Sequence, residues 1–81
     1  MVEVNLWSGL RHYTDGRDRV EIDGATTGEI LRGLVAAYPE LDPIIAAGVS
    51  VAVDGKIFAN SLTAPIKPDS EVYLLQQLKG G

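Results

Sequence analysis

The sequence predicts an α+β domain in which one main helix packs against a mixed sheet. Segments with alternating apolar and polar residues occur near both ends of the chain, which is typical of half-buried strands. Between them, one segment has apolar residues at three- and four-residue spacing, which predicts an amphipathic helix. The length of 81 residues and the apolar fraction of 46% suit one core, so we expect residues 1–81 to form a single domain.

The first two strands are predicted at residues 2–7, VEVNLW, and 19–23, RVEID. In both segments the apolar side chains alternate with polar ones, so each strand has one face turned to the core. The stretch between them is polar, and Asp15-Gly16 is its best candidate for a chain reversal. We therefore expect a hairpin with a long loop.

The next segment predicts the main helix. Thr26 and Glu29 form a capping-box pattern at its start, and Pro39 ends it. Gly28 and Gly33 each weaken a helix by about 1 kcal/mol relative to alanine, so packing must hold it together. The PELDPIIAAG segment from Pro39 onwards predicts a connector with one further helical turn. The apolar face of the helix comprises Ile30, Leu31, Leu34, Val35 and Tyr38.

The second half of the chain predicts a third strand, a turn with a short return strand, and a last strand. Residues 49–58, VSVAVDGKIF, contain the third strand, an Asp54-Gly55 turn and the return around Ile57. A proline-broken loop then leads to the last strand at 70–78. The alternation of that strand places Val72 and Leu74 on one face and Tyr73 and Leu75 on the other.

A helix with one apolar stripe and a sheet with one apolar face can cover each other in two layers. The hairpin comes first, the helix crosses, and the later strands rejoin the sheet. The last strand is the most apolar, which favours a central position. This order predicts the β-grasp, or ubiquitin-like, roll with a Gly-Gly tail that we expect to be flexible at residues 78–81.

Composition and motifs argue against several classes of function. The net charge of −4, without a basic patch, disfavours nucleic-acid binding. The N-terminal segment predicts neither a signal peptide nor a membrane span, so we expect a cytoplasmic protein. The chain has no cysteine, its one histidine is His12, and no metal or phosphate-binding motif is present. We expect no catalysis by this chain alone, no bound metal and no permanently bound cofactor.

The chain ends in Gly80 and Gly81, which add nothing to a core. A terminal carboxylate becomes electrophilic once it is adenylated, and an activating enzyme must admit the chain end into a narrow channel to reach ATP. Two glycines remove the side chains that would collide with such a channel. Once activated, the Gly81 carbonyl can accept a sulfur or an amine nucleophile. The tail therefore predicts acyl chemistry at Gly81.

The chain resembles the ThiS/MoaD family of sulfur carriers over essentially its whole length. The resemblance is carried by VSVAVDG, the proline-broken loop, PDSEVYLL and the terminal Gly-Gly, and AAYPEL and the length are more like MoaD. It implies that a MoeB-type enzyme adenylates Gly81 with ATP and that a sulfurtransferase supplies the sulfur of a thiocarboxylate. It also implies transfer of that sulfur, within a complex with a MoaE-type large subunit, to a molybdopterin precursor, with Gly80 as the threading partner of Gly81.

The partner surface is expected on the sheet face opposite the helix, because one helix can cover only one face. Tyr73 and Leu75 are its predicted centre, extended by Phe58 and Trp7 and, towards the tail, by Leu78. Three alternatives to a molybdopterin carrier stay open: a ThiS-like carrier for thiamine thiazole synthesis, a ubiquitin-like modifier joined to proteins through Gly81, and an interaction module whose tail is never processed.

Overall fold

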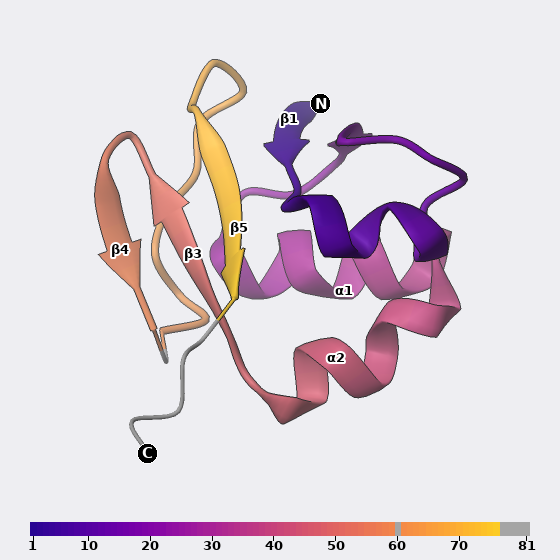
Figure 1. The fold of residues 1–81 in the computed structure, drawn as a ribbon. Helices are drawn as coiled ribbons and strands as arrows, with labels where there is room; N and C mark the ends of the chain where they lie inside the picture. The colour runs from indigo at the N-terminus through magenta and orange to yellow at the C-terminus, as the bar shows by residue number, and fades with distance from the viewer. Residues whose placement is uncertain (60, 77–81) are drawn as a thin grey trace.

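A computed structural model of the chain describes residues 1–59 and 61–76. The strands are β1 (Val2–Asn5), β2 (Arg19–Ile22), β3 (Val49–Val53), β4 (Lys56–Phe58) and β5 (Val72–Gln76), and the helices are α1 (Thr27–Ala37) and α2 (Asp42–Ala47). Two 3₁₀ helices, η1 (Ser8–Tyr13) and η2 (Pro39–Leu41), complete the elements (Figure 1).

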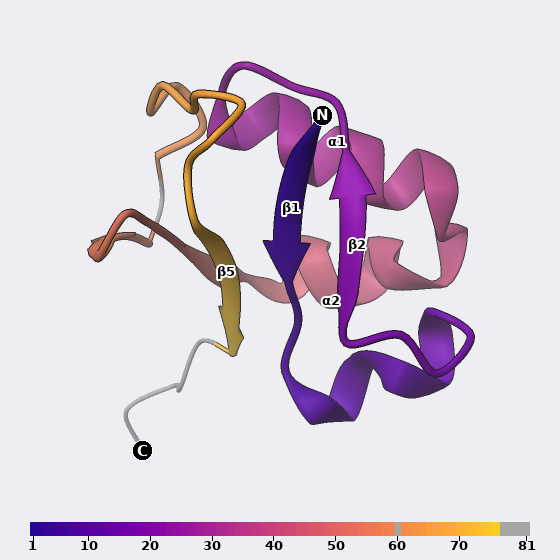
Figure 2. The same cartoon turned by 90° about the horizontal axis from the view of Figure 1, so that it is seen from above.

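The strands form one mixed sheet in the order β2-β1-β5-β3-β4. β5 lies at the centre, parallel to β1 and antiparallel to β3, as the apolar character of its sequence predicted. Figure 2 shows β5, β1 and β2 side by side with α1 and α2 behind them. The fold is therefore the predicted β-grasp roll, with the helices on one face of the sheet.

The core lies between α1 and the helix-facing side of the sheet. Ile30 and Leu34 of α1 are fully buried, as are Val4 of β1 and Val72 of β5. Leu41 of η2 closes one end of this core and is also fully buried. The apolar face that the sequence assigned to the helix is thus the face that packs on the sheet, with Val35 and Tyr38 only half-buried at its edge.

The start of α1 has the predicted capping box. The Thr26 hydroxyl accepts a hydrogen bond from the Glu29 N–H at 3.2 Å. The Glu29 carboxylate in turn accepts from the Ala25 N–H at 2.9 Å. These two bonds satisfy backbone donors that a helix start otherwise leaves without partners.

The two glycines of α1 lie at close approaches to neighbouring elements. A Cβ atom on Gly28 would stand 2.7 Å from the carbonyl oxygen of Leu62, and one on Gly33 would stand 2.5 Å from Cγ2 of Ile22. Because both distances are shorter than van der Waals contact allows, these positions favour glycine despite its low helix propensity. The close packing that holds α1 against its neighbours therefore also excludes residues larger than glycine at these two positions.

Two segments differ from the sequence-based expectation. Residues 8–13 form the 3₁₀ helix η1 rather than part of an irregular loop, with Leu10 buried beneath it. After Pro39, the chain forms η2 and then the six-residue helix α2, which is more than one further turn. η1 has one buried apolar residue, Leu10, and α2 is only six residues long, so periodicity alone predicts neither of them. Within the described part of the chain, none of the helices has the length and apolar character needed to span a membrane.

Candidate functional site: the outer sheet face and the base of the tail

The last strand is fixed on both sides, which gives the C-terminal tail a firm base. β5 pairs with β3 along its whole length, from Val53 with Val72 to Val49 with Gln76. On its other side it pairs with β1, and the side-chain amide of Asn5 donates a further hydrogen bond to the Val72 carbonyl at 3.0 Å. Gly80, Gly81 and Leu78 lie outside the described residues.

The entry into β5 is held by the β3–β4 turn. Asp54 and Gly55 both have positive φ angles, 50° and 87°, as the two-residue hairpin turn requires. The Asp54 N–H donates to the Glu71 carbonyl at 2.9 Å, and the Glu71 N–H donates to the Asp54 carboxylate at 2.8 Å. This reciprocal pair fixes the first residues of the strand that leads to the tail.

The sheet face turned away from the helices, here called the outer face, carries a row of apolar residues across three strands. Ala52 of β3 pairs with Ile57 of β4 on one side and with Tyr73 of β5 on the other, so the three side chains share one face. Ile57 is 66% exposed and Tyr73 is 46% exposed, whereas Ala52 between them is 9% exposed. An apolar row of this kind suits a protein partner.

Leu75 extends this row towards the tail. It is paired with Ser50 and half-buried, two residues beyond Tyr73 on the same face of β5. The structure therefore brings Tyr73 and Leu75 together on the outer face, where the sequence placed them. Towards the other edge of the sheet the row ends in the polar Asn5, which is paired with Tyr73.

Two aromatic residues that the sequence analysis added to this surface lie elsewhere. Phe58 pairs with Val51, whose side chain is buried on the helix-facing side, and it is half-buried against the core cluster. Trp7 is likewise packed against that cluster. Ile57 takes the outer-face position instead. The sequence contains the signal for this. Strand alternation counted from Val51 through the two-residue turn puts Phe58 opposite Val51 and Ile57 opposite Ala52, on the outer face.

The start of α1 offers no free anion site. The Thr27 N–H donates to the Ala64 carbonyl at 3.0 Å and the Gly28 N–H to the Leu62 carbonyl at 2.8 Å, while the Glu29 N–H is taken by the capping box. These bonds tie the 61–66 segment to the helix. His12 is exposed on η1, and no group of three or more histidine, aspartate or glutamate side chains with metal-site geometry occurs in residues 1–59 and 61–76.

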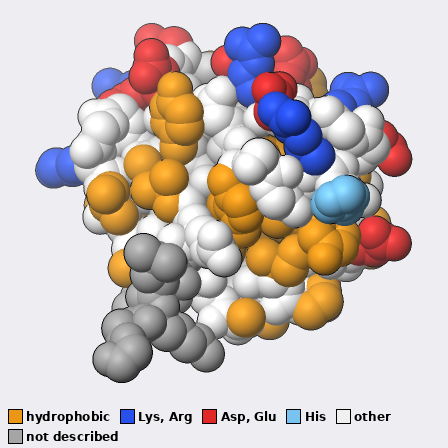
Figure 3. Space-filling model, in the orientation of Figure 1, with side chains coloured by type: hydrophobic (Ala, Val, Ile, Leu, Met, Phe, Trp, Pro, Cys, Tyr) orange, Lys and Arg blue, Asp and Glu red, His pale blue; other side chains and the backbone are white. Residues whose placement is uncertain are grey.

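Figure 3 shows hydrophobic side chains in separate groups on the side of the molecule seen in Figure 1. One group lies over the strands β4 and β5, and another lies over the helical half. Charged side chains lie mostly towards the upper and right-hand margins of this view.

Comparison with solved structures gives close matches over the full length of the chain. A chain of the Amycolatopsis orientalis BexX/CysO complex matches with a TM-score of 0.78 and 26% identity, covering 100% of both chains. Small archaeal modifier protein 1 from Haloferax volcanii matches with a TM-score of 0.71 and 28% identity, covering 99% of this chain and 98% of that one. No protein-family model and no curated protein matches the sequence.

Mycobacterium tuberculosis CysO has a TM-score of 0.83 at 22% identity, covering 96% of this chain and 100% of its own, and supports the fold alone. These neighbours are small ubiquitin-like proteins of the carrier and modifier type. The chain is similar to them in fold and in length.

Proposed function

We propose that this protein is a sulfur carrier whose terminal Gly81 is adenylated and then converted to a thiocarboxylate. The observation that carries the proposal is the junction of a doubly paired central strand, β5, with a sequence that ends in Gly80-Gly81. A rigid head can be recognised while the chain end enters an enzyme channel. The structural neighbours of the carrier and modifier type support the same class.

The chemistry follows from the terminal carboxylate. Attack of this carboxylate on the α-phosphate of ATP gives an acyl-adenylate and releases pyrophosphate. Hydrosulfide then displaces AMP at the carbonyl carbon and leaves the thiocarboxylate. Where a sulfurtransferase supplies the sulfur as a persulfide, the persulfide displaces AMP to give an acyl disulfide, and a thiol reductant cleaves that disulfide to the thiocarboxylate. This chain supplies the reacting carboxylate and the recognition surface, and the activating enzyme supplies ATP and the catalytic groups. The chain is a substrate and carrier in this scheme, and no enzyme on its own.

The pathway that we propose is molybdopterin synthesis, with a MoeB-type activating enzyme and a MoaE-type large subunit as partners. It rests on the sequence resemblance to MoaD. The apolar row Ile57–Ala52–Tyr73, with Leu75 beside it, is the surface that we assign to these partners, because it is exposed and leads along β5 to the tail. A ThiS-like role in thiazole synthesis would use the same tail chemistry with a different acceptor.

A second candidate is conjugation to other proteins, favoured by the similarity to small archaeal modifier protein 1. In that case a deprotonated lysine amine of a target would attack the adenylated Gly81 carbonyl, expel AMP and form an isopeptide bond. Covalent ladders of this protein on denaturing gels would favour this candidate. An unprocessed interaction module would give neither ladders nor activation.

The proposal is tested by ATP–pyrophosphate exchange with the activating enzyme from the same host. Full-length protein should support exchange, whereas a variant lacking Gly80 and Gly81 should not. The variant should keep the melting temperature of the full-length protein, because no core atom is removed. Full exchange with the truncated protein would rule out Gly81 as the site of activation.

A further inference from the structure

The outer face continues beyond the apolar row onto β1 and β2, and there it is polar. The inward residues of these two strands are valine and isoleucine, so alternation places their polar residues on the outer face: Glu3, Asn5, Arg19 and Glu21. Asn5 is paired with Tyr73 of β5, which joins the two parts. The outer face is therefore one surface with an apolar half on β3, β4 and β5 and a charged half on β1 and β2.

The charged half holds two carboxylates directly opposite each other. Glu3 of β1 and Glu21 of β2 are partners in the antiparallel ladder, and both are exposed. Side chains in such positions have Cβ atoms about 4.5–5.5 Å apart, and like charges there destabilise a sheet. Arg19 forms an ion pair with Glu3 at 3.8 Å, whereas Glu21 has no ion pair with any side chain in residues 1–59 and 61–76. The free protein thus keeps an unfavourable arrangement of charges beside its apolar row.

A depression of about 360 Å³ brings further carboxylates to this pair. Glu3 and Glu21 line it together with Asp69 and Glu71 from the segment before β5, and Tyr73 lines it from the apolar row. One basic side chain and the residue that bears the α-amino group complete its charged lining, so negative charge is in excess. Among the residues that the structure describes, no three acidic side chains have the geometry of a metal site. The excess charge therefore favours cationic side chains of a partner over a metal ion.

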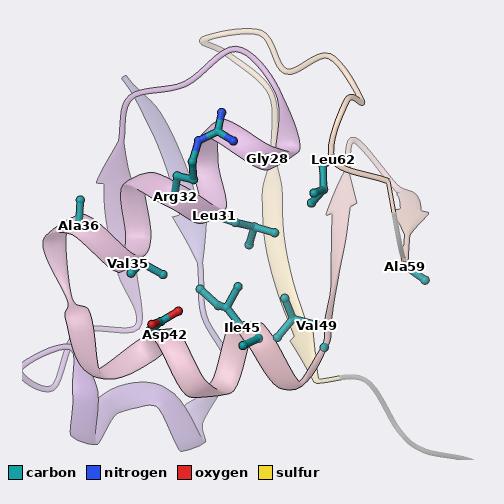
Figure 4. Close-up of a pocket in the computed structure, with 12 residues that line it drawn as sticks. Gly28, Leu31, Arg32, Val35, Ala36, Asp42, Ile45, Val49, Ala59 and Leu62 are labelled. Atoms are coloured by element: carbon teal, nitrogen blue, oxygen red, sulfur yellow. The ribbon is translucent and has the colours of Figure 1, made fainter.

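The helical side of the molecule has no comparable charge preference. A hollow of about 710 Å³ lies there between α1, α2 and β3, and Figure 4 shows the residues that line it. The charged residues among them are Arg32 and Asp42, one of each sign. An apolar surface beside an excess of one charge is thus a property of the outer face.

We propose that the outer face binds a protein surface that has an apolar centre flanked by lysine or arginine side chains, and that the Glu3–Glu21 pair selects for those cations. The Ile57–Ala52–Tyr73 row supplies the apolar contact. A cation placed beside Glu21 removes the repulsion that the free protein carries. A second copy of this chain would instead bring the same excess of carboxylates to the contact.

This inference rests on the proposed function and deepens it, because it names the chemistry that the activating enzyme must present to this surface. Charges at the rim of an interface act mainly on the association rate, and salt screens them. The exposed carboxylates should therefore speed the encounter with the enzyme, while the apolar row holds the complex together.

The first test is stopped-flow association of the full-length protein with the activating enzyme from the same host. At low ionic strength Glu21→Lys should slow association about tenfold, and Glu21→Gln should slow it by a smaller factor. Both differences should shrink near 1 M salt, where the Debye length is about 3 Å. Glu40→Lys is the matched control, because Glu40 is exposed on η2 away from the outer face and the change in net charge is the same.

A second measurement needs no partner. Glu21→Gln removes one of the two facing charges, so it should raise the melting temperature by about 1–5 °C. Glu40→Gln, which removes a carboxylate that faces no other across a ladder, should leave the melting temperature unchanged. A purely structural role for Glu21 would not make the same variant more stable and slower to bind.

Two results would overturn the inference while leaving the proposed function in place. One is association that is as fast in Glu21→Lys as in Glu40→Lys, in samples that still support ATP–pyrophosphate exchange. The other is a melting temperature that stays the same or falls in Glu21→Gln, which would show that the facing carboxylates do not repel each other. Full-length protein that neither binds the enzyme nor supports exchange would contradict the proposed function, and the partner assigned here would fall with it.

Discussion

Gln76 of β5 is paired with Val49 of β3, and this pair is the last of the ladder that joins the two strands. β5 pairs with β3 from Val72 to Gln76 and with β1 at Val72 and Tyr73, and the five residues of the sequence after Gln76 include the two glycines. Leu75, which belongs to the outer face and is paired with Ser50, directly precedes Gln76. One strand therefore carries part of the surface that we assign to partners and leads to the proposed reactive end.

The outer face gives the first prediction. Ile57→Glu and Leu75→Glu should each weaken binding to the activating enzyme at least about fivefold, which corresponds to a hot spot of about 1 kcal/mol. A charge in the centre of an apolar contact must be desolvated when the partner binds. Calorimetric titration measures the affinity, and Thr63→Glu, which is exposed and away from the outer face, is the control.

The circular dichroism spectrum and melting temperature of each variant must be compared in parallel. Ile57→Glu should leave the fold intact, since its side chain is 66% exposed. Unchanged affinity in both variants would remove the outer face from the interface. Unfolding of Leu75→Glu alone would place Leu75 in the core, and the Ile57 result would then decide the question.

The core gives the second prediction. Leu34 is fully buried between α1 and the sheet, so Leu34→Ala should lower the free energy of unfolding by about 2–5 kcal/mol. Arg32→Ala, at an exposed position of the same helix, should change it by less than about 0.5 kcal/mol. Urea denaturation measures both. Equal small losses would mean that Leu34 does not fill the interface.

The third prediction concerns Gly28, where two effects oppose each other. Alanine favours a helix over glycine by about 1 kcal/mol. A Cβ at this position, however, would stand 2.7 Å from the Leu62 carbonyl oxygen, and that carbonyl also accepts the Gly28 N–H. Overpacking of this kind costs about 1–3 kcal/mol. Gly28→Ala should therefore destabilise the protein in thermal unfolding, and a gain in stability would contradict the close approach of α1 and the 61–66 segment.

The parts of the fold that the sequence could predict are those encoded by local patterns. Alternation gave the strands and the two faces of β5, and the spacing from Ile30 to Leu34 gave the buried side of α1. The capping box at Thr26 and Glu29 and the positive φ angles at Asp54-Gly55 follow from short-range chemistry. These features need no knowledge of distant contacts.

What the sequence did not predict either lacks a recognisable local pattern or depends on contacts between distant residues. η1 ends at Thr14, whose buried hydroxyl lies within hydrogen-bond distance of the Leu10 and Arg17 carbonyls. The polar pattern of this stretch does not indicate a helix. The hollow lined by Leu31 of α1, Ile45 of α2 and Val49 of β3 exists only because α2 folds back beside α1. Ile57 is different: its pairing with Ala52 follows from the two-residue turn, so the outer row could have been assigned from register, with Phe58 on the inner side.

The central claim is that Gly81 carries sulfur, and intact-mass spectrometry of the protein purified from its native host tests it most directly. A carrier should show a species heavier by the difference between one sulfur and one oxygen atom. Fragmentation should localise the change to Gly81, and alkylation of the thiocarboxylate should shift that species alone. A chain that has only the unmodified mass, from cells in which the activating enzyme is present and active, would contradict the claim.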